Sequence, residues 1–244
     1  FAAAWAALAA LGSALDFLPR RENRDLAPRW LLVGAFLAGL SIGFRSQMAI
    51  LTMPVVLWVV LTRPRVRLSA IAAAVAGVIA WAAPLIWFSG GPRRYIAALG
   101  SQAGEDFSGV EMLWTHPTPR AIVTAVLQTF VRPWDSPTLA GIMLAFAAAG
   151  IVVLLRRSPR VLAFLVMTFG PYAVFHLLFQ DTPAIRYALP LVPLVAYLAA
   201  VVLAEADARV GAIVASGLAV ASLTFVVPAA AAFRKTPNPT FALL

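Results

Sequence analysis

Three segments of the chain carry arginine, glutamine and carboxylate side chains of the kinds that bind phosphates and sugars. The first segment holds Arg45 and Gln47, and the third runs from Gln180 to Tyr187. The second contains Arg93, Arg94, Tyr95, Glu105 and Asp106. Arginine presents a planar fork that binds phosphate oxygens bidentately. Carboxylates bind sugar hydroxyls, position a metal ion or act as a base. Together these groups are chemically suited to a phosphate-linked sugar.

The third segment also has a simpler interpretation. Asp181 and Arg186 carry opposite charges on either side of a short turn. On this alternative they form an ion pair at the membrane surface that only closes the turn. The charge pattern alone leaves both interpretations open.

Other familiar catalytic motifs are missing from the sequence. It has no Walker-type glycine loop, no zinc helix with paired histidines and no nucleophile-elbow serine. The absence of cysteine excludes disulfides and thiolate sites within this sequence. We expect His116 to be a solvated loop residue, and His176 to make a hydrogen bond between helices rather than to transfer protons.

The composition is that of a membrane protein. The chain is 62% hydrophobic and 12% charged, with a mean hydropathy of +0.89, whereas soluble domains are about 25% charged. The net charge of +9 does not indicate nucleic acid, because the arginines fall in the gaps between apolar runs instead of on one face. We therefore interpret them as topology signals, and the lipid bilayer as a partner.

Long apolar runs predict an all-α, polytopic transmembrane bundle with about six full spans. About 20 residues in a helix cross the hydrocarbon core, and the backbone must satisfy its own hydrogen bonds in lipid. The first run opens the chain, and the others cover residues 68–88, 138–155, 161–179, 188–204 and 210–227. Prolines inside these spans and in residues 30–62 favour kinks: Pro54, Pro84, Pro171, Pro190 and Pro193.

Residues 30–62 predict a hairpin of two short helices. The run is interrupted by Gly43-Phe-Arg45-Ser-Gln47, and arms of about 15 residues reach only about 22 Å, less than the roughly 30 Å core. The hairpin places Arg45 and Gln47 at its tip. The alternative is one long tilted helix with Arg45 snorkelling.

The basic loops predict the orientation. Dense arginine clusters at 19–29, 63–67 and 156–160 indicate cytoplasmic loops. Residues 89–137 then form an extracytoplasmic loop, with short amphipathic helices expected at 91–102 and 119–134. The three polar segments all fall on this outer side.

The ends of the chain predict that it is a portion of a longer protein. Phe1 opens inside an apolar run, and Leu244 ends the sequence without a polar tail. We expect residues 1–244 to be a single transmembrane domain, cut at both ends.

Three stretches resemble bacterial GT-C superfamily glycosyltransferases, which include protein O-mannosyltransferase-like and aminoarabinose-transferase-like proteins. Residues 186–200 are similar to that group's Arg-Tyr-x-Leu-Pro-x-x-Pro segment. Residues 34–54 are similar to its Gly- and Leu-rich helix, basic turn and second short helix. Ser89-Gly-Gly-Pro-Arg-Arg-Tyr95 with the following outer loop also fits.

The resemblance implies transfer of a sugar from a polyprenyl-phosphate donor to an extracytoplasmic acceptor, in a bacterial cytoplasmic (inner) membrane. It implies that four residues bind the donor phosphate or line the cavity that holds it: Arg45, Gln47, Arg186 and Tyr187. It implies acceptor-side roles, or the binding of a divalent metal ion, for Glu105, Asp106 and Asp181. The family's essential acidic residue lies in a first outer loop, which we expect upstream of Phe1, since Asp16 lies toward the inner end of the first run. The chain itself is thus predicted to hold no catalytic residue, and a C-terminal soluble region would begin near Phe233.

Two other classes remain open from the sequence. The chain is also compatible with a polytopic transporter or permease whose Arg45 binds an anionic substrate, or with a membrane subunit without chemistry of its own.

Overall fold

The computed structural model describes residues 2–15, 27–107 and 112–235, and every regular element within them is helical. This confirms the all-α prediction for the described part of the chain. Asp16 and most of the predicted basic loop at 19–29 lie outside the described residues, as do residues 236–244.

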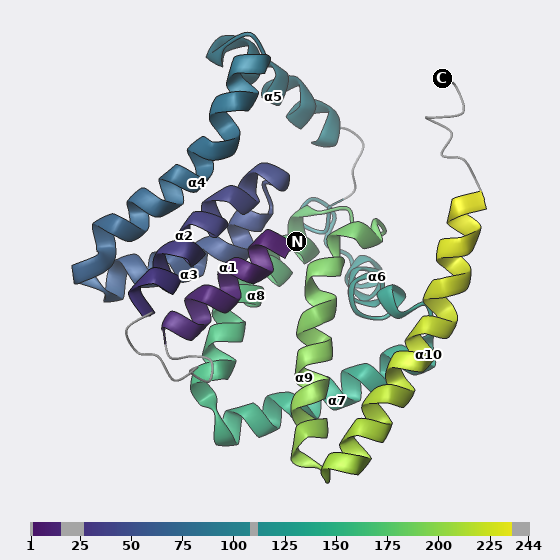
Figure 1. Ribbon diagram of the computed structural model, residues 1–244. Helices are drawn as coiled ribbons and strands as arrows, with labels where there is room; N and C mark the ends of the chain where they lie inside the picture. Colours follow the sequence, from purple (N-terminus) through teal and green to yellow (C-terminus); the bar gives the residue numbers. More distant parts are fainter. Residues whose placement is uncertain (1, 16–26, 108–111, 236–244) are drawn as a thin grey trace. The chain divides into compact units, whose positions relative to one another are not determined.

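The helices group into two compact units, each built from two separate stretches of the chain (Figure 1). The first unit comprises residues 1–115 and 159–181, and the second comprises residues 116–158 and 182–244. The first contains α1 (Ala2–Ala14), α2 (Ala27–Phe44), α3 (Met48–Thr62), α4 (Arg67–Phe88), α5 (Pro92–Phe107) and α8 (Pro159–Phe179). The second contains α6 (Pro119–Phe130), α7 (Pro137–Arg157), α9 (Val192–Glu205) and α10 (Ala208–Lys235). Short 3-10 turns lie at Pro64–Val66, Arg132–Trp134, Ile185–Tyr187 and Leu189–Leu191.

Four helices are long and apolar enough to cross a membrane: α4 with its preceding turn, α7, α8 and the first 21 residues of α10. Each matches a predicted span to within a few residues. The chain therefore has the helices of an integral membrane protein.

The predicted total of about six full spans is not confirmed, because the remaining apolar helices are shorter. The helix α1 has 13 residues and α9 has 14, which at about 1.5 Å per residue reach about 20 Å. In the span predicted at 188–204, the α-helix begins only at Val192, because two of its prolines lie at helix starts instead of forming kinks. Pro190 lies in a 3-10 turn, and Pro193 occupies the first turn of α9, where a missing N–H costs nothing.

The hairpin of two short helices is confirmed. The helices α2 and α3 pack against each other and are joined by residues 45–47. The backbone of Arg45 serves both helices: its N–H donates to the carbonyl of Ser41, and its carbonyl accepts from the N–H of Met48.

The helices α2 and α4 approach so closely that glycine is required on both. A Cβ on Gly39 would overlap the carbonyl oxygen of Ala74, and a Cβ on Gly77 would overlap the carbonyl oxygen of Phe36. The indole Nε1 of Trp81 donates to the carbonyl of Gly39 over 3.2 Å. Small residues that let two backbones meet are the usual basis of helix association in lipid.

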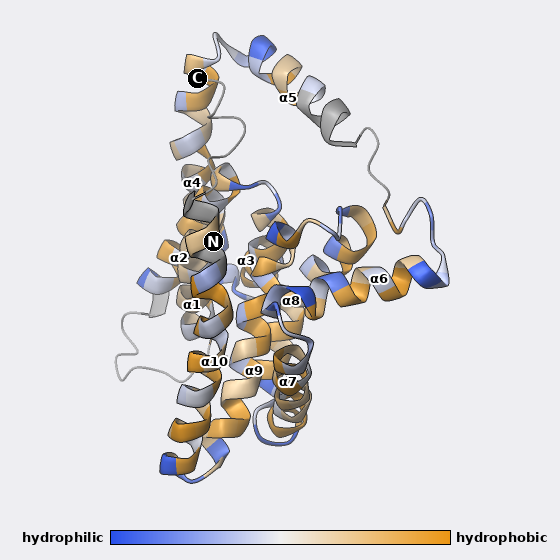
Figure 2. Ribbon diagram, turned by 90° about the vertical axis from the view of Figure 1, so that its right-hand side faces the viewer, coloured by the Kyte–Doolittle hydropathy of each residue, from blue (hydrophilic) through white to orange (hydrophobic). Residues whose placement is uncertain are grey.

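In the second unit, α7 packs against α9 in the same way. A Cβ on Gly150 would overlap the carbonyl oxygen of Leu198. The buried residues of both helices are apolar, and Figure 2 colours most of α7 and α9 as hydrophobic. An exposed ion pair between Arg157 and Glu205 joins the ends of the two helices. Asp207 then caps α10 by accepting from the N–H groups of Arg209 and Val210.

Both helices expected in the 89–137 segment are present. The helix α5 begins at Pro92, and α6 begins at Pro119 after an N-cap in which the Thr118 hydroxyl accepts from the N–H of Ala121 over 3.1 Å. The extracytoplasmic location of this segment stays a prediction.

Candidate functional site

Arg186 and Tyr187 lie in a 3-10 turn that the surrounding sequence imposes. The turn is closed by backbone bonds from Tyr187 to Ala184 and from Ala188 to Ile185. A second 3-10 turn follows, with Pro190 in its first positions. The chain cannot form a regular helix here, and the Arg186 side chain stays exposed while Tyr187 is half-buried.

The Tyr187 ring orients the Arg186 guanidinium. The guanidinium carbon lies 4.9 Å from the ring centroid, and Nη2 donates to the phenol oxygen over 3.1 Å. Stacking and a hydrogen bond together restrict a side chain that otherwise has many rotamers. A guanidinium has five N–H donors in a fixed fork. A positioned, exposed cation of this kind is suited to a phosphate.

Arg45 and Gln47 lie together in the turn between α2 and α3. Arg45 is half-buried, and Gln47 occupies the N-cap position of α3 without making a side-chain cap bond. The Oε1 atom of Gln47 is buried and has no hydrogen-bond partner among the described residues. Such an oxygen is costly unless a water or a ligand hydroxyl donates to it.

The structure therefore brings the predicted donor-side residues together in two pairs. Arg45 and Gln47 belong to the first unit, whereas Arg186 and Tyr187 belong to the second. The convergence of both pairs on one pocket stays a prediction.

The acidic candidates lie on two elements. Glu105 and Asp106 fall in the last turns of α5, and their side chains lie outside the described part. Asp181 lies in the turn that follows α8. Among the side chains that the structure describes, no three His, Cys, Asp or Glu residues cluster as metal ligands, and the suggested divalent metal remains an expectation.

A buried polar pair at the C-terminal end of α8 was missed by the sequence reasoning. His176 and Gln180 are almost fully buried, and His176 Nδ1 lies 2.9 Å from Gln180 Oε1. The Nε2 of Gln180 and the Oγ1 of Thr168 are buried without a hydrogen-bond partner in the described region. The spacing of four residues between His176 and Gln180 was the available signal, since it places both on one helix face. The expected bond from His176 to another helix stays a prediction.

The loop that follows α5 returns to the end of α8. The N–H of Trp114 donates to the carbonyl of Leu178 over 3.0 Å, and its ring lies 5.3 Å from that of Phe179. The stretch around Trp114 and the C-terminal end of α8 therefore lie at the same side of the first unit.

An apolar groove runs along α3 in the first unit. Its volume is about 710 Å³. It is lined by Ala49, Ile50, Met53, Pro54, Val56, Leu57, Val60, Ile71 and Pro171. The groove begins within one turn of Gln47, and its lining suits a hydrocarbon chain.

A family model described as the N-terminal domain of the protein O-mannosyl-transferase TMEM260 matches residues 2–70. No curated protein and no solved structure matches the chain. The matched stretch includes α1, α2, the Arg45–Gln47 turn and α3. It supports a relationship to the glycosyltransferases, while the affiliation to the bacterial GT-C group in particular stays a prediction.

Proposed function

We propose that the chain is part of an integral membrane glycosyltransferase that moves a sugar from a polyprenyl-phosphate donor to an extracytoplasmic acceptor. The observation that carries the proposal is the match of residues 2–70 to a protein O-mannosyltransferase domain. That stretch contains a polar turn, Arg45 to Gln47, at the end of an otherwise apolar hairpin.

The donor phosphate is bound by two arginines on this proposal. Arg186, oriented by Tyr187, binds phosphate oxygens through its fork, and Arg45 contributes a second positive charge. Both cations stabilise the negative charge that develops on the phosphate as the sugar leaves, which lowers the barrier to transfer. The buried Oε1 of Gln47 accepts a hydrogen bond from a hydroxyl group of the donor sugar.

The polyprenyl tail occupies the groove along α3. Every residue that lines the groove is apolar, so a hydrocarbon chain gains contact without leaving a polar group unsatisfied. Because Ala49 and Ile50 of the lining lie two and three residues after Gln47, a phosphate at the turn and a tail in the groove would follow one continuous path.

On this proposal, carboxylates hold the molecule that receives the sugar. Glu105, Asp106 and Asp181 are the groups proposed to bind acceptor hydroxyls or a divalent metal ion.

The test is sugar transfer by the full-length protein in proteoliposomes that contain a radiolabelled polyprenyl-phosphate sugar. We expect Gln47→Leu to lower kcat/KM by about fivefold, because a lost hydrogen bond to substrate costs about 1 kcal/mol. The matched control is Arg65→Ala, an exposed residue next to the other end of α3, which should leave transfer unchanged.

Two outcomes would contradict the proposal. One is the absence of transfer by the wild-type protein together with flux of an anionic solute that needs no lipid-linked sugar, which would support the permease. The other is wild-type transfer by Gln47→Leu, which would remove Gln47 from the site.

A further inference from the structure

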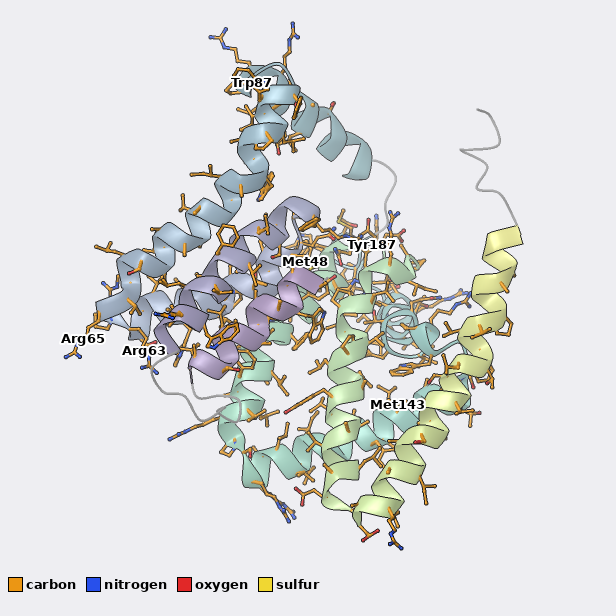
Figure 3. The ribbon with its side chains drawn as sticks, in the orientation of Figure 1. Met48, Arg63, Arg65, Trp87, Met143 and Tyr187 are labelled. Carbon is orange, nitrogen blue, oxygen red and sulfur yellow. The ribbon has the colours of Figure 1, made fainter. Side chains whose placement is uncertain are left out.

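The turn between α4 and α5 forms a protruding elbow with aromatic, aliphatic and cationic side chains. The elbow consists of Trp87, Phe88, Arg93, Arg94, Ile96 and Leu99. The chain reverses at Gly90 and Gly91, whose φ angles of 81° and 104° favour glycine. Both helices belong to the first unit and contact each other. Figure 3 shows Trp87 at one end of α4, with Arg63 and Arg65 at the other.

The length of α4 sets the depth of the elbow in a membrane. The helix has 22 residues, which span about 33 Å and match the roughly 30 Å hydrocarbon core. Arg67 begins the helix, and Trp87 and Phe88 end it. Because arginines flank the span on both sides, a membrane-spanning α4 would bring the turn at its end, with Trp87 and Phe88, to the level of the headgroups.

The elbow exposes more apolar surface than a water-facing turn would. Trp87 is 81% exposed, Phe88 is 85% exposed and Ile96 is 66% exposed. Aromatic side chains at the end of a span are typical of the interface, where the ring meets both the acyl chains and the headgroups.

The two cations of the elbow lie at the start of α5, Arg94 on the side away from the apolar stripe and Arg93 at its border. At about 100° per residue, Ile96 and Leu99 project to directions about 60° apart, and Arg94 projects about 160° from Ile96. Arg93 projects about 60° from Ile96 in the first turn of α5, so it lies at the border of the apolar stripe, where a long side chain can reach the headgroups. Figure 2 shows the change from hydrophilic to apolar residues at the start of α5. Both Arg93 and Arg94 are exposed. The positive-inside rule does not explain these two arginines. Arginines that set topology gather at the cytoplasmic end of a span, and α4 already has such a cluster at its other end.

We propose that this elbow is a binding surface for the anionic phospholipids of the leaflet that it faces. Trp87, Phe88, Ile96 and Leu99 insert among the upper acyl chains, and Arg93 and Arg94 bind headgroup phosphates. Two observations carry the proposal: the positive charges of Arg93 and Arg94 complement anionic headgroups, and α5 follows the α4 span after a two-glycine turn. The proposal does not depend on sugar transfer.

The test uses the full-length protein in nanodiscs, with single cysteines introduced at Ile96, Leu99 or Ala98. The present chain contributes no cysteine of its own. After labelling with an environment-sensitive fluorophore, quenching by lipids spin-labelled on the upper part of an acyl chain is measured. We expect positions 96 and 99 to be quenched several-fold more strongly than position 98, which lies on another side of α5.

The anionic preference is measured at position 96 with spin-labelled phosphatidylglycerol against spin-labelled phosphatidylcholine. About 1 kcal/mol per arginine near a charged surface corresponds to about a fivefold preference for each. The double change Arg93→Gln and Arg94→Gln should abolish the preference, whereas Arg65→Gln at the other end of α4 should leave it intact.

Three results would overturn the proposal. The first is equal quenching at positions 96, 98 and 99. The second is equal quenching by the two lipids in the wild-type elbow. The third is a preference that appears only after a polyprenyl-phosphate sugar is added, which would assign the arginines to the donor and not to bulk lipid.

Discussion

Replacing Arg186 with alanine in the full-length protein is expected to lower kcat/KM for sugar transfer by about 10- to 100-fold without affecting membrane insertion. A hydrogen bond between charged groups is worth about 1.5–3 kcal/mol, and a bidentate pair adds orientation. Arg186→Lys keeps the charge but loses both the fork and the stacking on Tyr187, so it should restore only part of the activity. Tyr187→Phe keeps the ring and removes the phenol acceptor of Arg186 Nη2, and a smaller loss is expected.

Transfer rates are compared at equal amounts of membrane-inserted protein. Arg156→Ala is the matched control, because Arg156 is an exposed arginine at the end of α7 in the same unit. Its activity should equal that of the wild type. Wild-type turnover in Arg186→Ala would remove this residue from the donor site and favour its structural interpretation as a residue that only closes a turn.

Gly77→Ala is expected to destabilise the first unit by about 3 kcal/mol or more. The new Cβ would overlap the backbone carbonyl of Phe36, and a backbone atom cannot move aside as a flexible side chain can. The helices α2 and α4 would separate, and the bond from Trp81 to Gly39 would break. Gly39→Ala should have a similar effect from the other side of the same contact, and the two losses should not be additive.

The measurement is the denaturation midpoint in detergent. The matched control is Gly141→Ala in α7, where a new Cβ has no neighbour within 4 Å, so the midpoint should stay the same or rise slightly. An unchanged midpoint in both Gly77→Ala and Gly39→Ala would contradict the close approach of α2 and α4.

The long spans and the hairpin could be predicted because lipid imposes simple rules on a sequence. The apolar run at 68–88 became α4, and the polar interruption at Arg45 separated α2 from α3. The full span predicted at 188–204 from its composition is not confirmed, because the apolar helix there is shorter. Composition does not reveal that Pro190 and Pro193 start a helix.

The site was less predictable because it depends on side-chain contacts. The sequence places Tyr187 beside Arg186, but neighbours stack only when the backbone turns as Ile185–Tyr187 does. The buried Oε1 of Gln47 and the His176–Gln180 pair depend on how α3 and α8 bury their faces. No spacing rule states which polar atoms lack partners.

The most direct test of the proposed donor site is the distance between the Arg45 turn and the Arg186 turn. Spin labels on Ser46→Cys and Leu189→Cys leave both arginines in place, and double electron–electron resonance on the full-length protein in nanodiscs measures their separation. A single phosphate site shared by Arg45 and Arg186 predicts a distribution centred well below the roughly 30 Å thickness of the hydrocarbon core. A distribution centred at or above that thickness would put the arginines at opposite leaflets and contradict the shared site.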